Sequence, residues 1–262
     1  MQIKKLTVGY VQTNCYIVSN EETKEAVIVD PGDRGDLIIE CCKREGLDVK
    51  AILLTHGHSD HIGALDQVKR AFGAKVYALE DEKELMADEN LNLSKSLLGT
   101  VIRTEADVWL RDNETVNLIG LPFQVIATPG HTEGSCCYYI ESEKALFAGD
   151  TLFEGSYGRV DLPGGSSVKL LHSVLDRLFE LPEDVTVYPG HLGYTTIGDE
   201  KKYNPLAPYT FHQPHLGFRN NGILSVIETT HSSDKHIGRS QRFIQYRFMK
   251  NRGKYPLSQN LV

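Results

Sequence analysis

Apolar residues in the first two hundred positions fall into short runs separated by polar turns rich in glycine, proline, asparagine and aspartate. Runs of this length predict β-strands, whereas apolar residues recurring every three or four positions predict helices. The predicted strands cover residues 13–19, 25–30, 49–55, 123–127, 135–140, 145–148 and 186–188, and the predicted helices cover about 33–46, 62–72 and 168–181. This interleaving indicates an α/β fold.

Two distant segments share one pattern. Residues 15–30 and 137–150 are each read as strand, polar turn and strand, and each ends in an aspartate, Asp30 or Asp150. Two similar halves suit a sandwich of two sheets with helices on the outside.

Length and composition set the class of protein. A chain of 262 residues can form one large domain, or one domain with an extension. No apolar run approaches the roughly 20 residues that span a bilayer, and no apolar signal segment follows the first lysines. The odd number of cysteines makes a poor disulfide framework, so we expect small buried hydrophobes in a cytoplasmic protein. The cysteines are Cys15, Cys41, Cys42, Cys136 and Cys137.

Charge divides the chain unevenly. Residues 207–262 contain eight Lys and Arg against two Asp and Glu, a net charge of +6. Because the whole chain has a net charge of −7, residues 1–206 carry −13. We expect residues 1–206 to be the catalytic domain and 207–262 a loosely ordered basic extension. The acidic domain makes nucleic acid an unfavoured partner. The extension's histidines, His212, His215, His231 and His236, have no metal-site spacing.

The segment after the predicted strand 49–55 has an unusual density of metal ligands. His56 and His58 are two residues apart, so an extended turn can direct both at one ion. Asp60 and His61 follow where the chain turns into a helix and can face a second ion. Gly57 is expected to permit a tight backbone path between the ligands.

Three more ligand types stand at the ends of later predicted strands. His131 follows residues 123–127, Asp150 follows 145–148, and His191 follows 186–188. Imidazoles and carboxylates without thiolates suit zinc, with iron or manganese as alternatives. Seven candidate ligands exceed the needs of one tetrahedral ion and indicate two, with Asp150 as a natural bridge. Two ions can share a water, lower its pKa and polarise a carbonyl or phosphoryl oxygen, so the pattern predicts a hydrolase.

The motif His56-x-His58-x-Asp60-His61, followed by His131, Asp150 and His191, resembles the metallo-β-lactamase superfamily. The resemblance implies a four-layer αββα sandwich with the metals at one edge of the sheets. It also implies that His56, His58 and His131 hold one ion, that Asp60, His61 and His191 hold the other, and that Asp150 bridges them.

Further motifs resemble the glyoxalase II (hydroxyacylglutathione hydrolase) branch in its short bacterial form. They include Gly130-His131-Thr132-x-Gly134-Ser135, Gly158-Arg159-x-Asp161 and Tyr188-Pro189-Gly190-His191. The resemblance implies hydrolysis of an acyl-thiol such as S-D-lactoylglutathione, with Asp60 orienting or deprotonating the nucleophile. Tyr157 and Arg159 are candidates to contact the substrate's carboxylates, although Arg159 could instead hold its loop by pairing with Asp161.

Two alternatives remain open. Persulfide dioxygenases share these motifs but use a single iron, so metal identity and stoichiometry would separate the two activities. Nucleases of the superfamily use the same set of ligands, and the basic extension could contact RNA in a salt-dependent way. The oligomeric state, the acyl group and the thiol carrier do not follow from the sequence.

Overall fold

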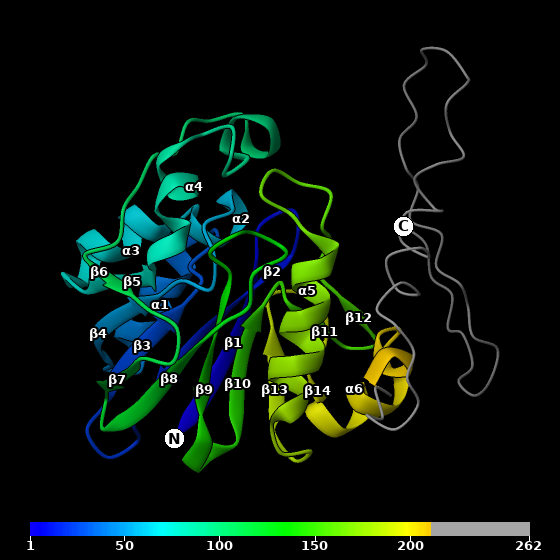
Figure 1. Ribbon diagram of the computed structural model, residues 1–262. Helices are drawn as coiled ribbons and strands as arrows, with labels where there is room; N and C mark the ends of the chain where they lie inside the picture. The colour runs from blue at the N-terminus through cyan, green and yellow to red at the C-terminus, as the bar shows by residue number, and fades with distance from the viewer. Residues whose placement is uncertain (211–262) are drawn as a thin grey trace, which may run out of the picture. The chain divides into compact units, whose positions relative to one another are not determined.

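The computed structural model describes residues 1–210, which contain two six-stranded sheets and one short hairpin (Figure 1). In spatial order, the first sheet consists of β1 (Gln2–Val8), β2 (Thr13–Ser19), β3 (Glu25–Val29), β4 (Asp48–Leu53), β5 (Lys75–Leu79) and β6 (Val108–Leu110). The second consists of β14 (Thr195–Thr196), β13 (Thr186–Pro189), β10 (Ala145–Gly149), β9 (Cys136–Ile140), β8 (Leu121–Ala127) and β7 (Thr115–Leu118). Strands β11 (Leu152–Phe153) and β12 (Ser156–Tyr157) form the hairpin.

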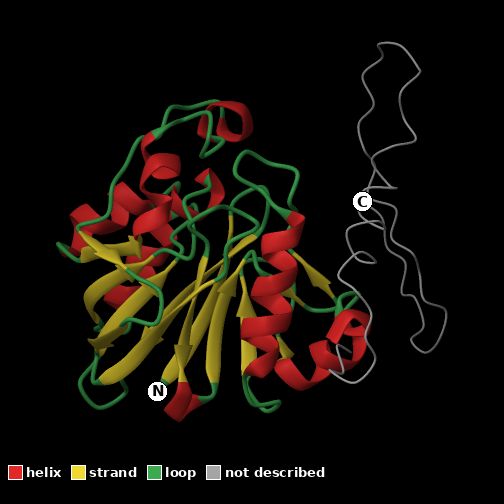
Figure 2. Cartoon of the chain, viewed as in Figure 1, coloured by secondary structure: helices red, strands yellow, loops and turns green. Residues whose placement is uncertain are grey.

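Helices cover the outer sides of the sheets, as Figure 2 shows in red. They are α1 (Gly35–Arg44), α2 (Ser59–Ile62), α3 (Leu65–Phe72), α4 (Lys83–Ala87), α5 (Ser167–His172) and α6 (Ile197–Tyr203). The single helix predicted for 62–72 is wrong at its start, because α2 and α3 are separate. The helix predicted for 168–181 is α5 followed by the helical turns Ser173–Arg177 and Leu178–Glu180.

Side chains that alternate along β2 pack into two different layers of the protein. Cys15 and Ile17 pack into a cluster with residues of α1 and α3, whereas Tyr16 and Val18 pack into a second cluster with residues of the other sheet. Successive strand residues face opposite sides, so a strand buried on both sides is apolar throughout. A third cluster joins the second sheet to α5 and the turns after it. Three cores between four layers confirm the predicted αββα sandwich.

The described residues test some of the other expectations. All five cysteines are buried and unpaired, which confirms their prediction as small core residues. Within residues 1–210, no helix is long and apolar enough to cross a membrane. Most of the predicted basic extension, residues 211–262, lies outside the described part of the chain.

Candidate metal centre

Four strands end at one edge of the sandwich and deliver the candidate ligands there. In the second sheet, β8 and β10 are both antiparallel to β9, and β13 is parallel to β10, so β8, β10 and β13 run in one direction. Their carboxyl ends lead to His131, Asp150 and His191. In the first sheet, β4 leads to His56 and His58, and α2 carries Asp60 and His61.

The structure brings all seven predicted ligands together. The nearest ligand atoms of His56, His58 and His131 lie within 4.8 Å of one another, and those of Asp60, His61 and His191 do the same. We call these the first and second ligand sets. They coincide with the two groups that the resemblance implies for the two ions.

Asp150 lies between the two sets. Its Oδ2 is 3.6 Å from His131 Nε2 of the first set and 3.4 Å from His191 Nε2 of the second. Its Oδ1 is 3.4 Å from His61 Nε2. A carboxylate in this position can reach ions in both sets.

Buried atoms without partners fit a metal. Among the described residues, five buried side-chain atoms have no hydrogen-bond partner: His56 Nε2, His58 Nε2, His61 Nε2, Asp150 Oδ1 and Ser59 Oγ. Leaving a buried polar atom unpaired is unfavourable by about 1–3 kcal/mol. Three of the five, His56 Nε2, His61 Nε2 and Asp150 Oδ1, belong to a group whose ligand atoms lie close enough to share one ion. Imidazole and carboxylate donors suit a divalent transition metal.

Neighbouring acceptors fix which histidine nitrogens face the centre. His61 Nδ1 donates to Asp30 Oδ2 at 3.0 Å, and His131 Nδ1 donates to the carbonyl oxygen of Arg159 at 2.8 Å. The Thr55 hydroxyl donates to Asp30 at 2.7 Å, so its oxygen can accept from His56 Nδ1 at 3.2 Å. In the neutral form of each ring Nε2 then carries the lone pair, as metal ligation requires. His131 Nε2 lies 2.9 Å from His58 Nδ1, with which it forms a hydrogen bond.

Glu82 connects the two loops that carry the first set. Its carboxylate accepts hydrogen bonds from the Gly57 amide at 2.8 Å, the Thr132 hydroxyl at 3.0 Å and the Gly134 amide at 2.8 Å. Gly57 has no left-handed φ, so the tight path expected at this position does not depend on one. A Cβ there would lie 2.6 Å from Met86 Cγ, so the glycine is required for close packing.

Asn14 supports the loop that carries His191. Its side-chain amide donates to the carbonyl oxygens of Pro189 at 3.0 Å and Leu192 at 3.1 Å, and its backbone amide donates to Gly190 at 2.7 Å. Leu192 has φ 68°, an uncommon conformation for a leucine, at the end of this loop. A Cβ on Gly190 would lie 2.2 Å from Asp150 Oδ1, so only glycine lets the loop approach this carboxylate.

Protonation differs between the sets. Burial, together with the neighbouring histidines, lowers the pKa of His56 well below its usual value and that of His58 to about 3. Burial also opposes charge on His191, yet Asp150 and Asp60 raise its pKa to about 9. Despite burial, His61 and His191 lower the pKa of Asp60 to about 2. His56 and His58 of the first set are therefore neutral, whereas the second set pairs cations with anions.

The two predicted substrate contacts lie beside this centre. Tyr157 is exposed on β12, and Arg159 follows it in the loop whose carbonyl binds His131. The Arg159 guanidinium makes a two-bond pair with Asp161, at 2.7 and 2.9 Å. The pairing therefore agrees with the loop-holding alternative, although the guanidinium stays accessible.

Several residues of the centre were missed by sequence reasoning. Asp30, Glu82, Asn14 and Thr13 act through contacts between distant segments; the Thr13 hydroxyl, for example, donates to Asp60 Oδ2 at 3.0 Å. Only Asp30 had a visible signal, as the aspartate that ends the first of the two similar segments.

This chain is similar to known proteins over almost the whole length of those proteins. The probable metallo-hydrolase YqgX of Bacillus subtilis is 37% identical over 206 residues, covering 78% of this chain and 97% of that protein. The hydroxyacylglutathione hydrolase GloC of Haemophilus influenzae is 36% identical over 208 residues, with coverages of 78% and 97%.

Solved structures agree. The BLEG-1 B3 metallo-beta-lactamase has a TM-score of 0.75 at 42% identity, covering 80% of this chain and 100% of that one. TTHA1623 in a di-iron-bound form has a TM-score of 0.67 at 37% identity, with coverages of 77% and 98%. ETHE1 from Myxococcus xanthus has a TM-score of 0.66 at 28% identity, with coverages of 84% and 93%. Residues 8–191 match the Metallo-beta-lactamase superfamily as a whole, and this chain belongs to that superfamily.

Proposed function

We propose that this metallo-hydrolase cleaves thioesters of the S-acylglutathione type, such as S-D-lactoylglutathione, using two divalent metal ions, with zinc as the first candidate. The observation that carries the proposal is the position of Asp150 between two complete ligand sets. The 36% identity to a hydroxyacylglutathione hydrolase supports the thioester. The identity to a protein solved in a di-iron-bound form supports two ions and keeps iron as an alternative.

The proposed ligands are the seven residues predicted from the sequence. His56, His58 and His131 would hold the first ion, Asp60, His61 and His191 the second, and Asp150 both. Divalent ions there would polarise the thioester carbonyl and make a bound water acidic near neutral pH.

The chain's own residues would orient the reaction. Thr13 binds Asp60 Oδ2 and so fixes the rotation of that carboxylate, leaving Asp60 Oδ1 available to accept a proton from the attacking water. Attack on the thioester carbon breaks the C–S bond and releases a thiolate, which is stable enough to leave without a strong general acid. We assign Tyr157 and Arg159 to the carboxylates of the thiol carrier, beside His131.

A persulfide dioxygenase is the second candidate, favoured by the similarity to ETHE1. It would use a single iron and consume oxygen, so metal content and oxygen uptake decide between the two.

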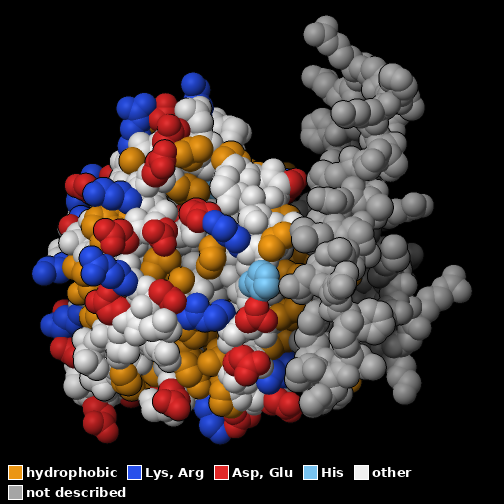
Figure 3. Space-filling view, viewed as in Figure 1, with side chains coloured by type: hydrophobic (Ala, Val, Ile, Leu, Met, Phe, Trp, Pro, Cys, Tyr) orange, Lys and Arg blue, Asp and Glu red, His pale blue; other side chains and the backbone are white. Residues whose placement is uncertain are grey.

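A nuclease has less support. On the face shown in Figure 3, basic and acidic side chains of the described residues are interspersed, without a broad basic surface for a phosphate backbone.

The test is hydrolysis of S-D-lactoylglutathione by purified, zinc-loaded protein, with His58→Ala as the control. Turnover that disappears in the variant would support a metal-dependent thioesterase. Absence of turnover in protein with both ions bound would refute glutathione thioesters as substrates. Oxygen uptake with glutathione persulfide on iron-loaded protein would then favour the dioxygenase.

A further inference from the structure

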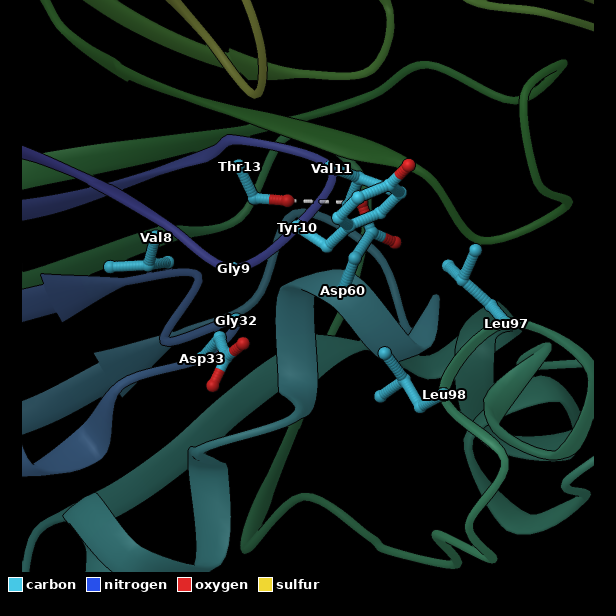
Figure 4. A pocket seen from close by; sticks show the side chains of 10 residues that line it. All are labelled: Val8, Gly9, Tyr10, Val11, Thr13, Gly32, Asp33, Asp60, Leu97 and Leu98. Atoms are coloured by element: carbon cyan, nitrogen blue, oxygen red, sulfur yellow. Dashed lines mark hydrogen bonds between the residues drawn. The ribbon is translucent and has the colours of Figure 1, made fainter.

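A pocket opens directly beside the second ligand set. It is a shallow groove open to solvent, and Asp60 forms part of its wall. Figure 4 shows the Tyr10 ring beside Asp60, with Leu97 and Leu98 entering from the facing segment. The loop between β1 and β2 supplies Tyr10, and the helical turn Ser94–Leu98 supplies the two leucines.

The pocket is apolar although it is accessible to water. Tyr10 is 99% exposed, Leu97 44% and Leu98 41%. Large apolar side chains gathered at the mouth of a site indicate a surface that is covered when a ligand binds. Contacts among the described residues leave these three side chains exposed.

Charge on the wall restricts the ligand. Asp33 and Asp60 contribute carboxylates, and none of the described residues that line the pocket is a lysine or an arginine. Asp60 would face the second ion, so Asp33 is the carboxylate that would repel an anionic acyl terminus. An uncharged aliphatic group would instead cover the leucines and the tyrosine ring.

The pocket also lies away from the proposed carrier contacts. Arg159 belongs to the loop that binds His131 of the first set, whereas the pocket wall includes Asp60 of the second. A thioester centred near Asp150 would therefore direct its two arms to different sides.

We propose that this pocket is the acyl subsite and that it takes an uncharged, aliphatic acyl chain. The inference rests on the proposed thioester hydrolysis and narrows its substrate class. Chain length and charge in the acyl group, more than the hydroxyl of a lactoyl group, would then set specificity.

The experiment compares three thioesters of one small neutral thiol, N-acetylcysteamine, so that glutathione recognition plays no part. Their acyl groups are acetyl, hexanoyl and adipoyl, the last matching hexanoyl in length but ending in a carboxylate. We expect kcat/KM for hexanoyl to exceed the other two by about tenfold, which corresponds to burial of roughly two methylene groups.

The variant L97S/L98S should abolish this preference. Val101→Ser is the matched control, because Val101 is 57% exposed in the same segment but does not line the pocket. All substituted side chains are exposed, so folding should be retained. Equal rates for acetyl and hexanoyl in the wild type, or a preference unchanged in L97S/L98S, would overturn the subsite while leaving thioester hydrolysis intact.

A binding measurement separates failure of the subsite from failure of the proposed function. Calorimetry compares two uncleavable thioethers, S-hexyl- and S-methyl-N-acetylcysteamine, on metal-loaded protein. If neither these thioesters nor S-D-lactoylglutathione is hydrolysed, about tenfold tighter binding of the hexyl compound, lost in L97S/L98S, would sustain the subsite and reject the reaction. Equal binding of the two thioethers would reject the subsite.

Discussion

The two ligand sets differ in exposure and charge although they meet at one carboxylate. His56, His58 and His131 are at most 2% exposed. In the second set His61 is equally buried, but the side chains of Asp60 and His191 are 13% and 21% exposed. Burial makes protonation of His56 and His58 unfavourable and lowers the pKa of each. In the second set, carboxylates outweigh burial and raise the pKa of His191 to about 9.

The difference indicates a division of labour. His56 and His58 are neutral and buried and can bind a cation without first losing a proton, so the first set suits an ion that stays in place. The second set must release protons to bind a cation, and it lies next to the pocket and the solvent. We therefore expect the first ion to be held firmly and the second to respond to pH and to mutations around it.

The largest expected effect comes from removing the group that the sets share. Asp150→Asn keeps the shape of the side chain but removes its charge from both sites. Bound metal should fall together with kcat/KM, the latter by more than about a thousandfold, because both sites lose an anionic ligand. Elemental analysis and steady-state kinetics measure the two losses.

Asp36→Asn is the control for that substitution, since Asp36 on α1 is exposed, pairs with Arg34 and belongs to neither ligand set. Circular dichroism should show the same fold in both variants. Full activity in Asp150→Asn would sink the mechanism based on two ions.

Lowering the pH should separate the two ions. Below about pH 9, His191 carries a proton that the second ion must displace, so its affinity should fall about tenfold per pH unit from His191 alone. His58, with a pKa of about 3, imposes no such loss between pH 9 and 6. Equilibrium dialysis at these pH values should show one ion per chain lost well before the other. Simultaneous loss of both ions would contradict the proposed difference between a firmly held first ion and a pH-sensitive second ion.

The pH dependence of the free energy of unfolding tests whether Glu82 supports the first set. Burial raises the pKa of Glu82 to about 7, above the roughly 4.5 of an unfolded chain, so the folded state binds its proton more tightly. This contribution is complete below pH 4.5 and is lost as the pH rises through 7. Relative to Glu82→Gln, the wild type should therefore lose up to about 3 kcal/mol of unfolding free energy between pH 4.5 and 8. Denaturant titrations across this range measure the difference, and parallel pH profiles would refute the assignment.

The parts of the fold that the sequence predicted are those determined locally. Strand β2 coincides with its predicted range, and the loops after β4, β8, β10 and β13 were recognisable because each places a ligand type directly after an apolar run. Element ends were less certain. The apolar period over residues 168–181 continues past His172, where the backbone leaves the α-helical pattern.

The supporting groups could not be predicted, because they act over long distances in the chain. Glu82 and Gly134 are 52 residues apart, and Asn14 and Pro189 are 175 apart. Neither Glu82 nor Asn14 stands in a motif, and each is an ordinary polar residue until the sheets pack together. The apolar pocket is also formed by separate segments, the loop after β1 and residues 97 and 98.

Asn14 provides the smallest and most selective test of the second set. Asn14→Ala removes the two side-chain hydrogen bonds to the loop at residues 189–192, so His191 should lose orientation while the first set is unaffected. Groups that orient a metal ligand typically contribute ten- to a hundredfold in affinity, and the partly exposed loop suggests about tenfold for the second ion. Asn20→Ala is the matched control, since Asn20 also donates to a backbone carbonyl, that of Ile119, at 3.0 Å. Competition with a chromophoric chelator resolves the two affinities, and an equal loss at both sites would show that Asn14 supports the whole fold and not His191 alone.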